Sequence, residues 1–316
     1  MSSPADRRKG AVELPPSVTA AELQERQFPP VSWAVPGLVP AGLTILAGKP
    51  KIGKSWLALD IAIACAEGGF TLGDRKCQKG DVLYAALEDN PRRLKTRLSK
   101  VARKATWPEG LHFWTEMKRL EDGGLDQLRQ WIDRVRNARL IVMDTFAKVR
   151  SPKGRDESSY EGDYRQAGTL KTLADKTGVA IIMVHHVRKM EADDPLDAVS
   201  GTTGLTGAVD TVVVLKRDGR GVTLFGRGRD IEELELAVEF QRDICRWREL
   251  GDADEVRISA ERRAVLETLR NAAEPMTARL VSDVSGRPYP AVRKLLFKMT
   301  NDGEVKKVGR GLFEGS

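Results

Sequence analysis

Residues 47–62 read AGKPKIGKSWLALDIA and contain the most informative motif of the chain. Within it, residues 48–55 read GKPKIGKS and satisfy the pattern G-x-x-x-x-G-K-[ST] of a phosphate-binding loop. The apolar run LTILAG (43–48) comes before the loop, and an amphipathic run over 54–67 follows it. A strand, a glycine-rich turn and a helix in this order bring backbone N–H groups and the positive end of a helix dipole to one anion. The stretch therefore predicts a nucleotide-binding loop.

Nine consecutive residues form the predicted binding loop: Gly48, Lys49, Pro50, Lys51, Ile52, Gly53, Lys54, Ser55 and Trp56. We expect the Lys54 ammonium to reach the β- and γ-phosphates and the Ser55 hydroxyl to coordinate Mg²⁺. Trp56 could touch the base of the nucleotide or pack in the core. ATP, or a close relative, is the expected substrate and Mg²⁺ the expected cofactor.

Two carboxylates follow apolar strand-like runs downstream of the loop. Asp144 ends LIVMD, and at a strand tip it could hold the water shell of Mg²⁺ or simply cap the next turn. Glu88 ends VLYAALE and could polarise an attacking water, as a catalytic base does. Its alternative role is to cap a helix starting at Pro91, although Asp89 or Asn90 would fill that role better.

Apolar runs alternate with helical patterns along most of the chain. The strand-like runs are LTILAG (43–48), DVLYAALE (81–88), LHFWTE (111–116), LIVMDTF (140–146), VAIIMVHH (179–186) and TVVVL (211–215). Helical patterns cover 54–67, 91–104, 124–137 and 163–177. Runs that are apolar throughout are typical of strands buried on both faces. The pattern predicts an α/β fold with a mostly parallel sheet, extended at its edge by antiparallel strands at 222–228 and 234–240.

The two ends of the chain differ from this pattern. Residues 1–30 contain five prolines and no sustained periodicity, so we expect a flexible arm. After a polar break at 251–255, residues 257–316 form a separate predicted module with a winged-helix-like order of elements. Its predicted helices and hairpin cover 260–273, 277–285, 288–301 and 304–314.

The charge and composition of the chain limit the partners and the location that can be expected for the protein. The formal charge is +7, and from Arg257 onward twelve basic residues stand against seven acidic ones, which favours a polyanionic partner for the tail. No apolar stretch approaches the roughly 20 residues that span a bilayer, and no secretion signal is recognisable, so we expect a cytoplasmic protein with no membrane partner. The three cysteines match neither a disulfide framework nor a zinc site.

The order of the motifs resembles that of RecA-like ATPases. A P-loop, a strand ending in Glu, a strand ending in Asp and a strand ending in a His pair follow one another. More closely, the chain is similar to the RepA-type hexameric replicative helicases of plasmids and phages, relatives of the DnaB helicases. The segments that carry the resemblance are 47–62, 82–98, 139–150, 184–189, 200–215 and 226–233. Residues 31–251 would then form a RecA-like ATPase domain with a P-loop core.

The resemblance implies a homo-oligomeric ring, usually of six subunits, with ATP at each subunit boundary. His186 matches the polar sensor at the end of the fourth core strand, and His185 should point the other way because strand neighbours alternate. Arg227 and Arg229 match basic positions that reach the neighbouring subunit's nucleotide, with Arg229 preferred. The alternative, given equal weight, is that Arg227 and Arg229 are only an exposed pair of arginines flanking a glycine.

Loops at 149–162 and 188–203 match those that line the channel of RecA-like rings and track single-stranded DNA. Acidic residues in both loops and the lack of any aromatic besides Tyr160 leave a solvated loop as the alternative. The candidate phosphate-binding cations are Lys148, Arg150, Lys153, Arg155, Arg188 and Lys189.

Three functional hypotheses remain open. The first is an ATP-driven ring motor on single-stranded DNA, a replicative DNA helicase of a mobile element. The second is a RecA-like, DNA-binding ATPase that acts as a loader or regulator without unwinding, with the tail as its main DNA-binding element. The third is an ATP-driven protein-docking factor, whose C-terminal module would bind replication partner proteins.

Overall fold

The computed structural model describes residues 16–102, 106–152, 157–187, 199, 204–219 and 221–315. The chain divides into two compact units, Met1–Val31 and Ser32–Ser316. In the first unit, helix α1 (Ala20–Glu25) begins at a capping box formed by Thr19 and Glu22 and buries none of its residues. The domain boundaries at 30, 251 and 257 stay predictions. Within the described residues, no helix has the length and apolar character needed to cross a membrane.

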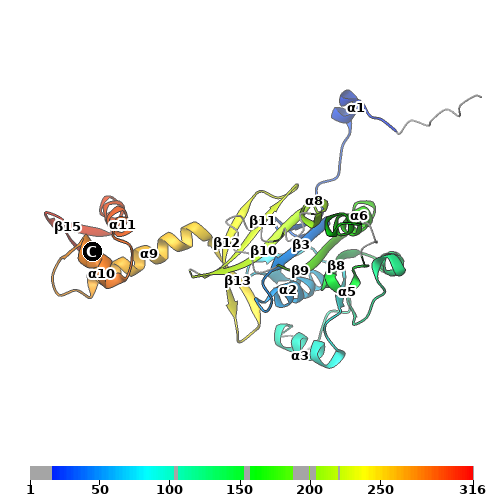
Figure 1. Cartoon of the computed structure of the whole chain (residues 1–316), viewed down its shortest axis with the longest axis horizontal. Helices are drawn as coiled ribbons and strands as arrows, with labels where there is room; N and C mark the ends of the chain where they lie inside the picture. The colour runs from blue at the N-terminus through cyan, green and yellow to red at the C-terminus, as the bar shows by residue number, and fades with distance from the viewer. Residues whose placement is uncertain are drawn as a thin grey trace, which may run out of the picture. The chain divides into compact units, whose positions relative to one another are not determined.

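The second unit is built on a nine-stranded sheet (Figure 1). Its parallel part confirms the predicted α/β fold. In spatial order it contains β10 (Thr211–Asp218), β3 (Gly42–Gly48), β9 (Ala180–His186), β8 (Ala138–Asp144), β6 (Asp81–Ala86) and β7 (Leu111–Trp114). Beyond β10 the sheet continues antiparallel through β11 (Gly221–Gly228) and β12 (Leu234–Gln241), as predicted, and then through the unpredicted β13 (Arg246–Asp252).

Side chains on the parallel strands alternate between two hydrophobic cores. In β8, Leu140 and Val142 pack into one core, whereas Ile141 and Met143 pack into the other. Both faces are therefore buried, which explains why these strands are apolar throughout. The first face is covered by α2 (Lys54–Glu67) and α3 (Pro91–Val101). The opposite face is covered by α4 (Gly124–Arg134), α5 (Phe146–Val149), α6 (Ser159–Thr177) and α8 (Gly204–Ala208).

The sequence did not predict strand β13, because the segment RWRELGD is mostly polar and only Trp247 in it is buried. It nevertheless contacts α2. Arg246 reaches the buried carboxylate of Asp60 at 2.6 Å, and Arg75 forms a two-pronged ion pair with Glu249. Helix α1, inside the arm expected to be flexible, was not predicted, and neither were α5 and α8. The other unpredicted short elements are β1 (Trp33–Val35), β2 (Val39–Pro40), β4 (Phe70–Thr71), β5 (Arg75–Lys76) and η1 (Leu120–Asp122).

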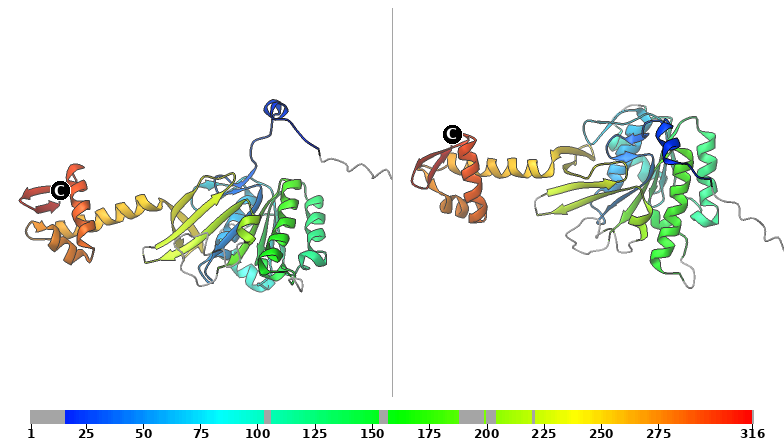
Figure 2. Two further views of the ribbon diagram at one scale, coloured as in Figure 1. Left: turned by 45° about the horizontal axis from the view of Figure 1, so that its top comes forward. Right: turned by 90° about the horizontal axis from the view of Figure 1, so that it is seen from above.

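The C-terminal residues form a small hydrophobic core of their own, built around Val265, Leu296 and Met299. The helix predicted from 260 begins at 253, because the Asp252 side chain caps it by accepting from the N–H groups of Asp254 and Glu255. The predicted helices and hairpin are present, with one short strand added (Figure 2), but the winged-helix likeness stays a prediction. The elements are α9 (Ala253–Arg270), β14 (Met276–Thr277), α10 (Ala278–Ser285), α11 (Tyr289–Asn301), β15 (Val305–Gly309) and β16 (Leu312–Gly315).

Candidate nucleotide-binding site

The P-loop joins the end of β3 to the start of α2, as the sequence predicts. Gly53 is the N-cap of α2 with φ 112°, a left-handed conformation that disfavours any residue with a side chain. A Cβ on Gly53 would lie 2.9 Å from the Trp247 ring, and one on Gly48 would lie 2.6 Å from the Leu215 carbonyl oxygen. Because Gly53 has no side chain to cap α2, backbone N–H groups at the helix start are left for an anion. The loop therefore fits a phosphate group.

Lys54 is buried, with 3% of its surface exposed, and its Nζ makes three short contacts. It donates to the carbonyl oxygens of Gly48 at 2.7 Å and Lys49 at 3.0 Å, and lies 3.0 Å from His186 Nδ1. Burial lowers the pKa of Lys54 from 10.5 to about 8, against the opposing attraction of Asp144 and Glu88. The ammonium is therefore charged at neutral pH but titrates close to it.

His186, the predicted sensor, stands directly beside this ammonium. A lysine ammonium has no lone pair, so Nδ1 of His186 must accept the hydrogen bond and the ring must be neutral. Burial, and then the Lys54 charge, lower the pKa of His186, in agreement with a neutral ring. The charges that act most strongly on His185 belong instead to Asp163, so the two rings face different surroundings, as predicted.

Asp144 ends β8 with 5% of its surface exposed, and its Oδ2 accepts a hydrogen bond of 2.7 Å from the Tyr84 hydroxyl. Tyr84 lies on the adjacent strand β6 and is fully buried, so its hydroxyl needs such a partner. Burial, followed by the Asp144 charge, raises the pKa of Tyr84 well above 10, which keeps the hydroxyl protonated as a donor. Sequence reasoning missed Tyr84, although a tyrosine inside the apolar run VLYAA was a usable signal.

Glu88 lies two residues beyond the end of β6, in the turn that leads to α3. Its Oε1 accepts a hydrogen bond of 3.3 Å from the Thr145 hydroxyl, the residue after Asp144. Asn90 caps α3 by accepting from the Arg93 N–H, so Glu88 is not needed as the cap. The structure thus brings Lys54, Asp144, Glu88 and His186 together at the carboxyl ends of β3, β8, β6 and β9. Their catalytic and metal-binding roles stay predictions.

Trp247 of β13 supports the P-loop from outside the parallel sheet, and sequence reasoning missed it. Its Nε1 donates to the Gly53 carbonyl oxygen at 3.1 Å, and the residue is 1% exposed. Its ring packs against Phe240 of β12 at 5.1 Å between centroids, and Phe240 packs against Trp56 at 6.5 Å. These contacts hold the N-terminal end of α2, where the phosphates are expected. Arg97 covers the Trp56 ring at 4.8 Å, and Trp56 contact with a base stays a prediction.

Trp247→Phe is expected to raise the KM for ATP about three- to tenfold while kcat changes little. The phenyl ring keeps the packing, but the Gly53 carbonyl loses a hydrogen bond worth about 1 kcal/mol. Steady-state kinetics would separate the two constants. Trp131→Phe is the matched control, because Trp131 is a buried tryptophan in the opposite core whose Nε1 has no partner among the described residues. Equal changes in KM for both variants would contradict a specific role for Trp247.

Arg227 and Arg229 lie away from the P-loop of their own chain. The backbone N–H of Arg229 donates to the Asp210 carbonyl, and the Asp210 carboxylate accepts from the Leu43 N–H at the start of β3. The P-loop follows the opposite end of β3. The Arg229 guanidinium is 3.5 Å from the Asp210 carboxylate, and Arg227 pairs with Glu233 at 3.3 Å. In a single subunit, neither arginine is placed to act on the local nucleotide.

The predicted DNA-binding loops are only partly described. Lys148 is exposed, and Arg150 pairs with Asp163 at 2.7 Å. Lys153, Arg155, Arg188 and Lys189 lie outside the described residues. Two exposed tyrosines at the start of α6, Tyr160 and Tyr164, stack with their ring centroids 6.1 Å apart. Helix α8, which follows the second loop, packs against α6, whose start follows the first loop.

The sequence matches the AAA domain family over residues 9–192, more than half of the chain and including part of the predicted arm. It is similar to the DNA repair protein RadA of Mycobacterium tuberculosis (strain ATCC 25618 / H37Rv), with 24% identity over 195 residues, 61% of this chain and 35% of RadA. RadA of Streptococcus pneumoniae (strain ATCC BAA-255 / R6) is 25% identical over 181 residues, 56% of this chain and 36% of that protein. The chain thus spans about a third of the length of these curated relatives.

Two solved structures share the fold. The ATPase domain of G40P superposes with a TM-score of 0.51 at 13% identity, covering 67% of this chain and 85% of that one. A DnaB-like replicative helicase, solved in a study of its interactions with primase, superposes with a TM-score of 0.50 at 13% identity, covering 66% and 57%. The described α/β domain therefore has the fold of a RecA-like P-loop ATPase domain.

Proposed function

The chain belongs to the AAA domain family, and from that premise we propose that it is an ATP-hydrolysing ring motor that translocates on single-stranded DNA. The observation that carries the proposal is the convergence of one ammonium and two carboxylates beside the P-loop. Lys54 lies against the P-loop carbonyl of Gly48, and Glu88 is joined by a 3.3 Å hydrogen bond to Thr145, the residue after Asp144. Both carboxylates attract the Lys54 charge. This is the set of groups that phosphoryl transfer from a nucleotide to water requires.

Each side chain would have a separate task. Lys54 would exchange its contacts with the P-loop carbonyls for the phosphates, and Ser55 and Asp144 would hold Mg²⁺. Mg²⁺, when bound, neutralises charge on the phosphate oxygens. Tyr84 would keep the Asp144 carboxylate oriented through its 2.7 Å hydrogen bond. Glu88 would accept a proton from the attacking water. The neutral His186 ring, beside Lys54, would respond when that ammonium changes partners.

Several observations support a single-stranded DNA partner. The curated relatives are DNA repair proteins, and one solved relative is a replicative helicase. The exposed, stacked Tyr160 and Tyr164 offer aromatic faces at the start of α6, and single-stranded DNA is commonly bound by base stacking on such faces. We therefore place the DNA along this end of α6 and the adjoining loops. By resemblance to the RepA-type helicases, we further infer a hexamer that acts in replication of a mobile element.

The proposal is tested by two measurements under one set of conditions. ATP and single-stranded DNA should together drive assembly into a ring, read by mass measurement, and ATP hydrolysis should be stimulated by that DNA. The same sample should displace a strand from a forked duplex. Slow hydrolysis without unwinding would favour a loader or regulator. ATP-dependent assembly with no salt-dependent affinity for any nucleic acid would favour the protein-docking alternative.

Arg229 is proposed to act on the nucleotide of the neighbouring subunit, because it is not placed to act on its own. Rings of Arg229→Ala subunits alone, or of Lys54→Ala subunits alone, are expected to be inactive. Random mixing should restore hydrolysis at about a quarter of the boundaries, where an intact Lys54 faces an intact Arg229. Phosphate release from the mixture measures this recovery. The same mixture made with Arg227→Ala in place of Arg229→Ala tests which arginine acts. If neither mixture recovers hydrolysis, a role of these arginines across the subunit boundary is contradicted.

A further inference from the structure

Positive charge in the C-terminal module is unevenly distributed. Its α9 and α10 cations are largely engaged: Arg262 pairs with Asp302 and Glu304, and Arg279 pairs with Asp283. By contrast, six cations on α11 and the β15–β16 hairpin form no ion pair with any described residue. These are Arg293, Lys294, Lys298, Lys306, Lys307 and Arg310.

The acidic residues of the module lie mostly elsewhere. Helix α11 contains no acidic residue, and within β15 and β16 the only one is Glu314, which stands across from Lys306. Because α11 packs against β15, the unpaired cations belong to adjoining elements. The surface formed by the exposed residues of α11 and by the hairpin, here called the α11 surface, therefore concentrates the positive charge of the tail.

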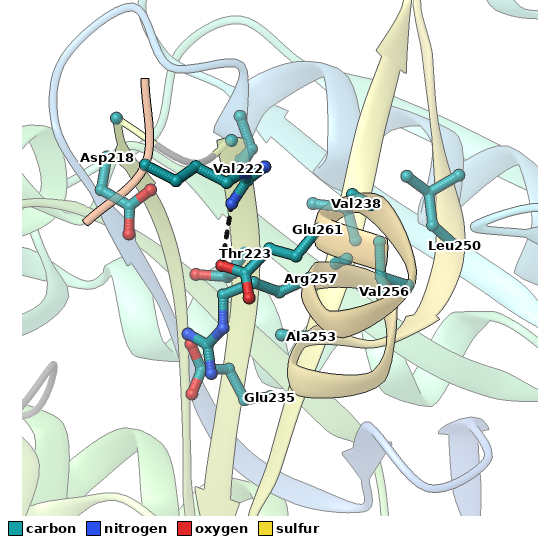
Figure 3. Close-up of a pocket in the computed structure, with 15 residues that line it drawn as sticks. Asp218, Val222, Thr223, Glu235, Val238, Leu250, Ala253, Val256, Arg257 and Glu261 are labelled. Carbon is teal, nitrogen blue, oxygen red and sulfur yellow. Dashed lines mark ion pairs between the residues drawn. The ribbon is translucent and has the colours of Figure 1, made fainter. Parts of the chain in front are cut away.

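Helix α11 is held in place by the hydrophobic core of its own module. Val292, Leu296 and Met299 are buried in the core of the module, which fixes the rotation of the helix. Arg287, just before α11, forms an ion pair of 3.2 Å with Glu261 of α9 (Figure 3). The same figure shows Ala253, Val256 and Arg257 of α9 directed toward strands β11 and β12. Arg287 is thus engaged in an ion pair within the module and is not part of the α11 surface.

The outward face of α11 combines charge with an apolar side chain. Arg293, Lys294 and Lys298 are exposed, and Phe297 between them is 69% exposed. A 13-residue helix is about 20 Å long and fits the major groove of B-form DNA. Cations on such a helix can reach the phosphates on either side of the groove, and an apolar side chain can contact a thymine methyl group.

We propose that the α11 surface binds duplex DNA, with α11 in the major groove and the β15–β16 hairpin on the adjacent backbone. Single-stranded DNA suits this surface less well, because sites for it stack successive bases on several free aromatic faces. The exposed aromatics of α11 are Phe297 and Tyr289, and the Tyr289 ring is already covered by Arg279 at 5.7 Å. The site is distinct from the nucleotide pocket and from Tyr160 and Tyr164. It would let the chain hold double-stranded DNA without ATP.

The test uses the full chain without nucleotide and a fluorescent hairpin duplex that has no single-stranded end. Anisotropy titrations over a range of salt would compare wild type with the triple variant Arg293→Ala, Lys294→Ala and Lys298→Ala. We expect affinity to fall about 10- to 100-fold at low salt, and the slope of log K against log salt to decrease by about 2 to 3, because each lost phosphate contact removes about 0.9. Phe297→Ala should lower affinity about three- to tenfold with an unchanged slope, since an apolar contact releases no counterion.

A matched triple variant, Arg129→Ala, Arg134→Ala and Arg136→Ala, removes the same charge from exposed positions on and after α4 and should bind within about twofold of wild type. Lys294→Arg with Lys298→Arg keeps the charge and should retain binding, which separates loss of contact from loss of fold. Equal weakening in both alanine triples would overturn the proposal. An equal loss of affinity for oligo(dT) would overturn it as well. Displacement of the duplex by poly-glutamate at matched charge would also overturn it, because it would indicate an acidic protein partner. Duplex binding through α11 in a chain that never unwinds DNA would uphold this inference and reject the motor.

Discussion

Glu88→Gln is expected to bind ATP about as well as the wild-type chain while hydrolysing it roughly 10²- to 10⁴-fold more slowly, the range that general-base catalysis contributes. Glutamine keeps the size of the side chain, and its carbonyl oxygen can still accept the 3.3 Å hydrogen bond from Thr145. It cannot take a proton from water. Binding of a fluorescent ATP analogue and single-turnover release of phosphate would measure the two effects separately.

The matched control for this variant is Glu116→Gln. Glu116 is an exposed glutamate that follows the end of β7 by two residues, as Glu88 follows the end of the neighbouring strand β6. Its replacement should leave hydrolysis unchanged. A normal rate in Glu88→Gln, or an equal loss in the two variants, would show that Glu88 is not the base.

Lys54→Ala is expected to weaken nucleotide binding at least about tenfold and to reduce hydrolysis at least about 100-fold, because charge-assisted hydrogen bonds to the phosphates are lost. Unfolding is not the expected cause. Burial lowers the pKa of Lys54 to about 8, so keeping the charge in the folded protein costs about 3 kcal/mol at pH 7, and alanine removes that cost. For the wild type, this cost disappears as the pH rises from 8 to 10.5. Thermal unfolding of both proteins at pH 7 checks this point.

The same pKa predicts how nucleotide binding depends on pH. Phosphate groups favour the charged ammonium, so wild-type affinity should fall as the pH rises through 8, by up to about tenfold between pH 7 and pH 9. Burial and the Lys54 charge lower the pKa of His186, so its ring stays neutral as the pH rises and does not account for such a decrease. Lys54→Ala should show no such decrease. A wild-type affinity that stays constant from pH 7 to 9 would mean that Lys54 does not meet the phosphates.

The sequence was sufficient for the elements that depend on local patterns. The P-loop pattern, with an apolar run before it and a helical run after it, placed β3 and located both ends of α2 at 54 and 67. The prediction that this helix is amphipathic was wrong, because every residue from Leu57 to Ala66 is buried. Apolar runs likewise placed the parallel strands, because burial on both faces requires apolar residues at every position. The polar strand β13 gave no such signal, and the start of α9 depended on a capping aspartate that the sequence reasoning had assigned to a break.

The chemical groups of the site can be read from the sequence alone: a phosphate loop, two carboxylates at strand ends and a basic tail. Which of these groups meet follows from the folded arrangement of the strands. Tyr84 orients Asp144 across 60 residues of sequence, His186 lies beside Lys54 across 132, and Trp247 holds Gly53 across 194. These contacts follow from the order in which strands lie in the sheet, and that order arises from packing both faces at once. A local pattern cannot specify it, because the same apolar run would fit several places in the sheet.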